Sequence, residues 1–310
     1  MTVFAAKSTK DIWHKGKKGN VYQLDSILNQ LNIEKKLLEA GFQINYVDSK
    51  NREKEAENLV SLVHKKGYLN VFNQKAEKET YLSNGLMLQE SLYPLVLEHA
   101  LIAKEIVDSA LENYAFSTIG GGHHCEYEKP LGFGLVNNMA ISAIYASSLG
   151  NRVAVLDLDT HYSNGCNDLL RNKKNILMCS LWNQVIPAWK YFDSQNNLVH
   201  EKVTNITEYF GKLNIVLEEI SRFKPSLFIY HLGFDVLETD RMGGIVGMDE
   251  AKLLEREIIV KRFLDAQRIP FIIYRGGGYI NYGGNIQTQE ARRENLIRTQ
   301  VIAIEQYLSK

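Results

Sequence analysis

The stretch that decides the fold is Val153-Ala154-Val155-Leu156-Asp157-Leu158-Asp159-Thr160-His161. Its leading apolar residues are typical of a buried parallel strand, and polar side chains follow where that strand would end. Side chains two positions apart on a strand point to the same side, so we expect Asp159 and His161 to lie together. Ligands of open α/β sheets bind beyond the carboxyl ends of the strands. The stretch therefore predicts a parallel sheet with a carboxylate and an imidazole at its ligand-binding edge.

This Asp-x-His pair has two interpretations. Asp159 and His161 supply part of the ligand set of a catalytic zinc site, which keeps a further position open for water. The alternative is a helix cap formed by the carboxylate, next to a solvent-exposed histidine. Taken alone, the pair does not decide between a metal site and a cap.

Three further apolar runs end in residues that can carry chemistry. Gly233-Phe234-Asp235 follows the run over residues 226–232, and Gly276-Gly277-Gly278-Tyr279 follows the run over residues 269–274. The run over residues 115–119 is followed by Gly120-Gly121-Gly122-His123-His124. Glycines allow close approach of the backbone, and the tyrosine presents a hydroxyl. Four strand exits that deliver two Asp, three His and one Tyr are hard to ascribe to packing. Asp235 in particular supplies a third metal ligand.

In their order along the chain, these motifs resemble the zinc-dependent histone deacetylases, the acetylpolyamine amidohydrolases and the acetoin-utilisation-type deacetylases of the arginase/deacetylase superfamily. The resemblance also rests on Gly132-Phe133, Asn137-Asn138, Asn164-Gly165 and Asp240-Arg241-Met242-Gly243. It covers about residues 114 to 280, and its motifs are specific together although each is weak alone. It implies an arginase/deacetylase-like α/β fold, with a three-layer open, mostly parallel sheet and helices on both faces.

The resemblance implies that Asp159, His161 and Asp235 bind zinc or iron(II). The metal activates water for attack on an amide carbonyl, and the hydroxyl of Tyr279 stabilises the oxyanion that forms. The family also holds a structural monovalent cation, K⁺ or Na⁺, beneath the metal. The groups that correspond to its ligands belong to Asp157, Asp159, His161, Ser180 and Leu181.

The tandem histidines become the acid/base pair of the reaction. His124 takes the proton from water and delivers it to the leaving amine, as a group with a pKa near the working pH can do, while His123 contributes mainly electrostatically. Asp157 would orient His123, and Asn164 would orient His124. Many members of the family carry Asp where this chain has Asn164. The Asn places the chain nearer the class II and class IV branches and implies a less basic His124.

The resemblance also implies a tunnel for an acyl-lysine side chain. Its wall and rim would be formed by Gly132, Phe133, Trp189, Met242 and Gly277. Phe133 and Met242 are alternatively plain core residues, and Trp189 comes from a gapless count in which Trp182 is the rival. An apolar Met242 argues against polyamine substrates, whose second ammonium is held by acidic groups.

This chain also departs from the family pattern. Tyr162 replaces a second histidine, Arg275 stands at the position of a glycine, and the first hundred residues lack the usual His-Pro-rich entrance motif. Because this entrance motif is missing, the resemblance does not identify the residues that form the rim of the substrate site or the partners that bind there.

Two functions follow from these motifs. The first is a metal-dependent amidohydrolase that removes an acyl group, in most cases acetyl, from acetyl-lysine or from a small acylated amine. The second is a catalytically idle relative that binds acylated ligands or protein partners. A binuclear manganese ureohydrolase would need additional carboxylates, which Ser163 and Val236-Leu237 do not provide. Because every chemical role is filled, the hydrolase is favoured.

Composition agrees with a single catalytic domain over residues 1–310. The chain is 45% hydrophobic, enough for one large α/β core, and no linker-like stretch divides it. Thirty-six basic residues balance thirty-six acidic ones, so no field favours nucleic acid or an anionic membrane. We interpret the lysine-rich start, residues 7–18, as a solvated face. The oligomeric state is not indicated.

The remaining signals concern location. Cys125, Cys166 and Cys179 are scattered without Cys-x-x-Cys pairing, which suits a reducing cytoplasm. No signal peptide or membrane-length apolar run is visible.

Between the motifs, helical and strand patterns alternate, which implies right-handed crossovers. We expect a strand over residues 42–47 and helices over residues 26–40, 97–109, 138–148, 206–222, 249–267 and 291–308. Four histidines outside the motifs are predicted to be surface or capping groups: His14, His64, His99 and His200. For His231, within an apolar run, a hydrogen-bonded core position is favoured over substrate contact.

Overall fold

The structure, a computed structural model, describes residues 2–12, 14–15, 21–22, 25–74, 80–83 and 85–308. Within these residues a parallel sheet of eight strands has the order β4-β1-β5-β10-β9-β6-β7-β8. Its strands are β1 (Thr2–Ala6), β4 (Ile44–Val47), β5 (Ala115–Gly120), β6 (Val153–Asp157), β7 (Ile176–Trp182), β8 (Leu198–Lys202), β9 (Leu227–Leu232) and β10 (Phe271–Arg275). A separate antiparallel pair joins β2 (His14–Lys15) to β3 (Val21–Tyr22).

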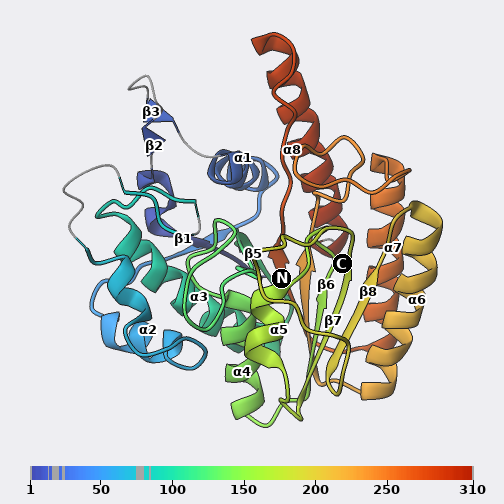
Figure 1. Cartoon of the computed structure of the whole chain (residues 1–310), viewed down its shortest axis with the longest axis horizontal. Coiled ribbons are helices and arrows are strands. Elements are labelled where there is room, and N and C mark those ends of the chain that lie inside the picture. The colour runs from blue at the N-terminus through green and yellow to red at the C-terminus, as the bar shows by residue number, and fades with distance from the viewer. Residues whose placement is uncertain are drawn as a thin grey trace.

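Helices cover both faces of the sheet, and Figure 1 shows α6 and α7 on one side of the strands and α2, α3 and α4 on the other. The α-helices are α1 (Asp25–Glu39), α2 (Glu53–Val60), α3 (Leu92–Glu112), α4 (Asn138–Ser148), α5 (Asn164–Leu170), α6 (Ile206–Phe223), α7 (Glu250–Gln267) and α8 (Ile286–Leu308). Two short 3-10 helices, η1 (Lys7–Asp11) and η2 (Tyr68–Val71), complete the set. The expected three-layer architecture is therefore confirmed.

Each central strand is buried on both faces, which explains its uninterrupted apolar sequence. On β6, Val153 and Val155 belong to the core beneath α2 to α5, whereas Ala154 and Leu156 belong to the opposite core. The opposite core packs against α6, α7 and α8. This two-sided burial is why the strand exits, rather than the strand faces, are left to carry polar chemistry.

Strong helical periodicity located four helices to within one residue at each end: α1, α4, α6 and α7. The predictions for α3 and α8 began five residues late. Pro94 lies in the first turn of α3, where proline is tolerated, and α8 begins at Ile286, which is 73% exposed and carries no apolar pattern. The sequence interpretation missed β1, β7, β8, α2 and α5, because short elements show too few periods to be recognised.

Four neighbouring strands bring the predicted motifs together. β5, β10, β9 and β6 are adjacent in the sheet and parallel, so their carboxyl ends meet at one edge. Gly122 of the turn after β5 has φ +68°, and a Cβ there would lie 2.0 Å from the Val136 carbonyl oxygen. Only glycine fits this turn, which carries the tandem histidines to the shared edge.

A buried arginine ties two of these strand exits to α7. Arg256 is fully buried and donates to the carbonyl oxygens of Leu158, at 3.3 Å, and Gly233, at 2.8 Å. It pairs with Glu257, which also accepts from the hydroxyls of Tyr230 and Tyr307. Arg256 therefore fixes the backbone next to Asp159 and Asp235.

Replacing Arg256 with Met is expected to lower the free energy of unfolding by about 3–5 kcal/mol, because it leaves the Glu257 carboxyl buried without its cation. Denaturant titration measures the change. Arg262→Met, at an exposed position of the same helix, is the matched control and should change stability by less than about 0.5 kcal/mol. A loss below about 1 kcal/mol in the Arg256 variant would contradict the assigned role.

Candidate metal centre and active site

Three side chains from two strand exits converge at the edge of the sheet. His161 Nδ1 lies 3.0 Å from Asp159 Oδ1 and 2.9 Å from Asp235 Oδ2. The other ring nitrogen, Nε2, lies 3.0 Å from the Met242 carbonyl oxygen. Since a carbonyl only accepts, Nε2 carries a proton toward Met242, which leaves Nδ1 as the nitrogen that can offer its lone pair to a metal ion placed between the two carboxylates. One imidazole and two carboxylates facing one point form the donor set of a divalent-metal site.

The electrostatics of the three groups fit a dication. Burial and then the charge of Asp159 raise the pKa of Asp235 to about 8. Burial alone lowers the pKa of His161, but hydrogen bonds and charge from Asp159 and Asp235 outweigh it and raise the pKa to about 11. Protons held on His161 and Asp235 thus offset part of the negative charge that the two buried carboxylates would carry. A divalent ion would replace those protons, so the residues present fit the expected metal.

The turn after β10 closes over this group through Gly277. Its N–H donates to Asp159 Oδ2 at 3.0 Å. A Cβ at Gly277 would lie 2.8 Å from both Asp159 Oδ2 and Asp235 Oδ2. A side chain is therefore excluded, which explains a glycine just before the expected catalytic tyrosine.

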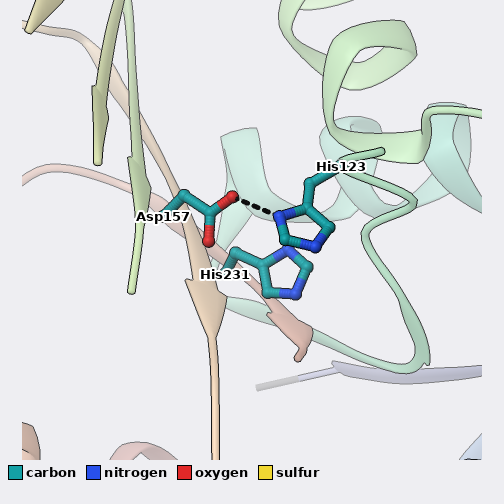
Figure 2. A group of neighbouring side chains, drawn as sticks. All are labelled: His123, Asp157 and His231. Atoms are coloured by element: carbon teal, nitrogen blue, oxygen red, sulfur yellow. Dashed lines mark hydrogen bonds and ion pairs between the residues drawn. The ribbon is translucent and has the colours of Figure 1, made fainter. Parts of the chain in front are cut away.

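His123 lies beside the metal group, and Figure 2 shows its ring hydrogen-bonded to Asp157. Its Nδ1–H donates to Asp157 Oδ2 at 2.8 Å, and its Nε2 lies 3.8 Å from Asp159 Oδ1. Burial lowers the pKa of His123, but the charges of Asp157 and Asp159 outweigh it and raise the pKa. The expected pairing of Asp157 with His123 is present.

His231, at the end of β9, completes the group drawn in Figure 2. Its ring centroid lies 4.7 Å from that of His123, and its Nδ1 has no hydrogen-bond partner among the described residues. A Cβ at Gly121 would lie 2.7 Å from this Nδ1. His231 is buried and lines the cavity, so the prediction of a hydrogen-bonded core histidine is wrong for Nδ1.

His124 is paired with Asn164, as expected. His124 Nδ1 lies 2.7 Å from Asn164 Oδ1. Burial, and then the charges of His123 and His161, hold the pKa of His124 well below its usual value. The imidazole of His124 is therefore neutral near pH 7.

A cavity of about 360 Å³ joins these groups to the surface. The predicted tunnel residues all line it: Gly132, Phe133, Trp189, Met242 and Gly277. The Trp189 ring centroid lies 4.4 Å from that of His124, whereas Trp182 is buried against Tyr162 and Tyr191. The geometry therefore favours Trp189 over its rival.

Tyr279 also lines the cavity. Burial, and then the charges of Asp159 and Asp235, raise the pKa of its hydroxyl, so the phenol stays protonated and can donate. Its backbone N–H donates to Asp240 Oδ2 at 2.6 Å, which anchors the turn that carries it.

The same cavity is also lined by residues that the sequence interpretation did not assign to it: Thr9, Ile12, Gln30, Leu95, His99 and Arg275. Thr9, Gln30, Leu95 and His99 come from η1, α1 and α3, and Ile12 follows η1, all far from the motifs in sequence, whereas Arg275 ends β10 directly before the turn of Tyr279. Arg275 is buried, and its Nε donates to the Thr118 carbonyl oxygen at 3.0 Å. No local pattern could have placed the side chains of η1, α1 and α3 in the same cavity as His161.

The prediction of surface or capping groups was wrong for three of the four remaining histidines. His64 is buried and lies 2.9 Å from the Glu126 carbonyl oxygen. His200 is buried beside Ser180, and His99 lines the cavity. The His14 side chain lies outside the described part of the structure. The groups that these histidines contact are distant in sequence, so local sequence patterns could not predict where their side chains lie.

Two other expectations are only partly covered. The strand register places Asp157 of β6 opposite Ser180 of β7, so two of the residues expected to hold a monovalent cation are adjacent.

Of the lysine-rich start, Lys7 is exposed and pairs with Asp48 at 2.6 Å, while residues 13 and 16–20 lie outside the described residues. None of the described helices is long and apolar enough to cross a membrane.

Comparisons with known proteins agree with this geometry. The family model of the histone deacetylase domain matches residues 19–290. Histone deacetylase 2 of Arabidopsis thaliana is 27% identical over 259 residues, which cover 77% of this chain and 66% of that protein. The acetylpolyamine amidohydrolase of Burkholderia pseudomallei is 28% identical over 171 residues, covering 51% of this chain and 49% of that protein. The chain thus spans about half to two thirds of these relatives' lengths.

Solved structures show the same fold. The crystal structure of acetylpolyamine aminohydrolase from Burkholderia pseudomallei superposes with a TM-score of 0.76 at 18% identity, covering 98% of both chains. The HD domain of HDA15 gives the same TM-score and identity, covering 97% of this chain and 91% of that one. At this identity the likeness shows the fold alone.

Proposed function

This chain belongs to the histone deacetylase domain family, and from that premise we propose that it is a metal-dependent hydrolase of N-acyl amides, chiefly N-acetyl amides. The observation that carries the proposal is the convergence of His161 Nδ1 with Asp159 and Asp235 within 3.0 Å, next to a cavity that Asp159 and His161 line. We propose zinc as the metal, with iron(II) as the alternative. When bound, such an ion polarises the amide carbonyl and makes water nucleophilic at neutral pH.

The residues of the chain would supply the remaining steps. Phe133, Trp189 and Met242 line the cavity where the acyl-bearing chain enters. His124 would accept the proton of the attacking water at Nε2 and return it to the leaving amine. Tyr279 would donate its hydroxyl to the oxygen that gains negative charge. His123, held by Asp157, would support the charge of the attacking group from the side.

The substrate we propose is an acylated lysine side chain in a peptide or a small acylated amine. The names of the relatives support both, because one is a histone deacetylase and another an acetylpolyamine amidohydrolase. Met242, Phe133 and Ile186 give the cavity an apolar lining, which suits an alkyl chain.

We also propose that residues 1–310 act as one catalytic domain, because β1, near the start, pairs with β5 of the site. A structural K⁺ or Na⁺ would lie between the adjacent strands β6 and β7, held by groups of Asp157, Asp159, His161, Ser180 and Leu181. A cytoplasmic location is supported by the free, buried state of Cys125, Cys166 and Cys179.

Assay of the zinc-loaded and iron(II)-loaded protein tests the proposal. The panel should hold acetyl-lysine and longer acyl-lysine peptides, acetylpolyamines and small N-acetyl amines, with release of free amine as the readout. Hydrolysis of at least one substrate that a chelator abolishes and metal restores is expected. Tight binding of acylated ligands without turnover would instead establish the catalytically idle alternative.

A further inference from the structure

Glu126 is a buried carboxylate directly behind the pair formed by His124 and Asn164. It is 2% exposed, and its Oε1 accepts a hydrogen bond of 2.9 Å from Asn164 Nδ2. At the other end of the amide, Asn164 Oδ1 lies 2.7 Å from His124 Nδ1. A continuous chain of hydrogen bonds therefore runs from a carboxylate, through an amide, to an imidazole that lines the cavity.

Glu126 is also held by groups outside this chain. The Asn137 N–H donates to His64 Nε2 at 3.1 Å, so the proton of this imidazole is on Nδ1, which donates to the Glu126 carbonyl oxygen at 2.9 Å. Burial lowers the pKa of His64 to about 3, which keeps the ring neutral and able to serve both partners. The Lys190 N–H donates to Glu126 Oε1 at 3.3 Å. The carboxylate therefore cannot turn away without losing partners.

The direction of each hydrogen bond follows from what the groups can do. A carboxylate accepts and does not donate, so Asn164 must point its NH₂ group at Glu126 and its oxygen at His124. That oxygen accepts, so His124 carries its proton on Nδ1 and keeps Nε2 free. With the amide flipped, two buried acceptors would face each other unsatisfied. The His124 carbonyl oxygen accepts a second, longer bond of 3.3 Å from the same NH₂ group, so it favours the same orientation of the amide more weakly than Glu126 does.

We infer that Glu126 is a positioning residue for hydrolysis, which acts through Asn164 to hold His124 in the tautomer whose Nε2 accepts a proton. The inference rests on the proposed function, since it concerns the base which that function requires. The carboxylate also polarises the amide, because linked hydrogen bonds strengthen one another. With Asn164 in this position, the chain thereby obtains from Glu126, behind the amide, the acceptor-only group that an aspartate would place directly against His124.

A double-mutant cycle on positions 126 and 164, in zinc-loaded protein, tests the inference. Glu126→Gln alone is expected to lower kcat roughly tenfold with little change in KM, a part of the about 10²–10⁴-fold that a positioned general base contributes, since a glutamine can donate as well as accept. In the Asn164→Asp background the same substitution should leave kcat unchanged or raise it. In that background the aspartate at position 164 orients His124 directly. The Glu126 carboxylate then repels the like charge of that aspartate.

The matched control is Lys190→Met, which removes the other side-chain contact of Glu126, an ion pair at 3.9 Å, and leaves the Asn164 contact intact. It should keep kcat within about twofold, as expected for a half-exposed pair. An equal fall of kcat on Glu126→Gln in both backgrounds would indicate simple packing and overturn the inference. So would an unchanged kcat in the natural background.

Imidazole nitrogen NMR gives a readout that does not need turnover. In the zinc-loaded natural protein His124 should show its proton on Nδ1, and Glu126→Gln should introduce the other tautomer. If this change occurs in a protein that hydrolyses none of the panel substrates, the positioning survives and the proposed function fails. If the enzyme is active and Glu126→Gln leaves the tautomer of His124 unchanged, the function stands and the inference is wrong.

Discussion

Asp235→Asn is expected to abolish stoichiometric metal binding and to lower the hydrolytic rate by more than about 100-fold. Loss of a residue that only supports a metal ligand costs up to about 100-fold, and loss of a ligand itself should cost more. Asp235 Oδ2 lies 2.9 Å from His161 Nδ1, so an amide at this position removes one of two anionic ligands. The fold should survive, because an asparagine oxygen can still accept the 3.0 Å bond from the Thr160 N–H.

Elemental analysis, thermal unfolding and the rate of amine release together measure this outcome. Asp265→Asn is the matched control, since it makes the same chemical change at an exposed carboxylate paired with Lys261 on α7. It should retain metal and rate. A variant at Asp235 that keeps one metal ion per chain and full activity would refute the metal centre.

Tyr279→Phe is expected to retain the fold and the metal while the turnover falls by about 10²–10³, the usual cost of losing one oxyanion donor. The reason is that the substitution removes only the hydroxyl, and the turn remains anchored by the bond of 2.6 Å from the backbone N–H to Asp240. The change should appear in kcat rather than in KM, because the hydroxyl matters chiefly when negative charge develops.

Steady-state kinetics of the metal-loaded variant measure this effect. Tyr282→Phe is the matched control on the following loop, where the ring is 41% exposed and packs beneath the Arg241 guanidinium. A phenylalanine keeps that ring contact, so the control should be as fast as the natural protein. A natural rate in the Tyr279 variant would mean that the metal alone polarises the carbonyl.

Much of the site could be predicted from the sequence because its parts are local. The alternation of side chains on a strand places Asp159 and His161 on one side, and this needs only the two-residue spacing after an apolar run. The helices α4 and α6 were located by their own periodicity in the same way. Such features are carried by neighbours in sequence, so a pattern within a short window contains them.

The surroundings of the site could not be predicted in this way. His64 and His99 looked like isolated surface groups, yet one holds the Glu126 carbonyl and the other lines the cavity. Arg275 stood out only as a departure from a glycine, with no indication that it would be buried in the cavity wall. Their partners lie tens of residues away, and no short window contains both members of such a contact.

By itself, the sequence determined which chemical groups stand at the ends of which strands, since apolar runs, glycine turns and side-chain alternation are local properties of the backbone. The tertiary structure alone decided that β9 lies between β10 and β6, which brings Asp235 within 2.9 Å of His161 across 74 positions. It also decided that Glu126 stands behind Asn164 and that His231 meets His123. Strand order and buried pairing depend on the free energy of packing the whole sheet between two helical layers, and that free energy is not a property of any single segment.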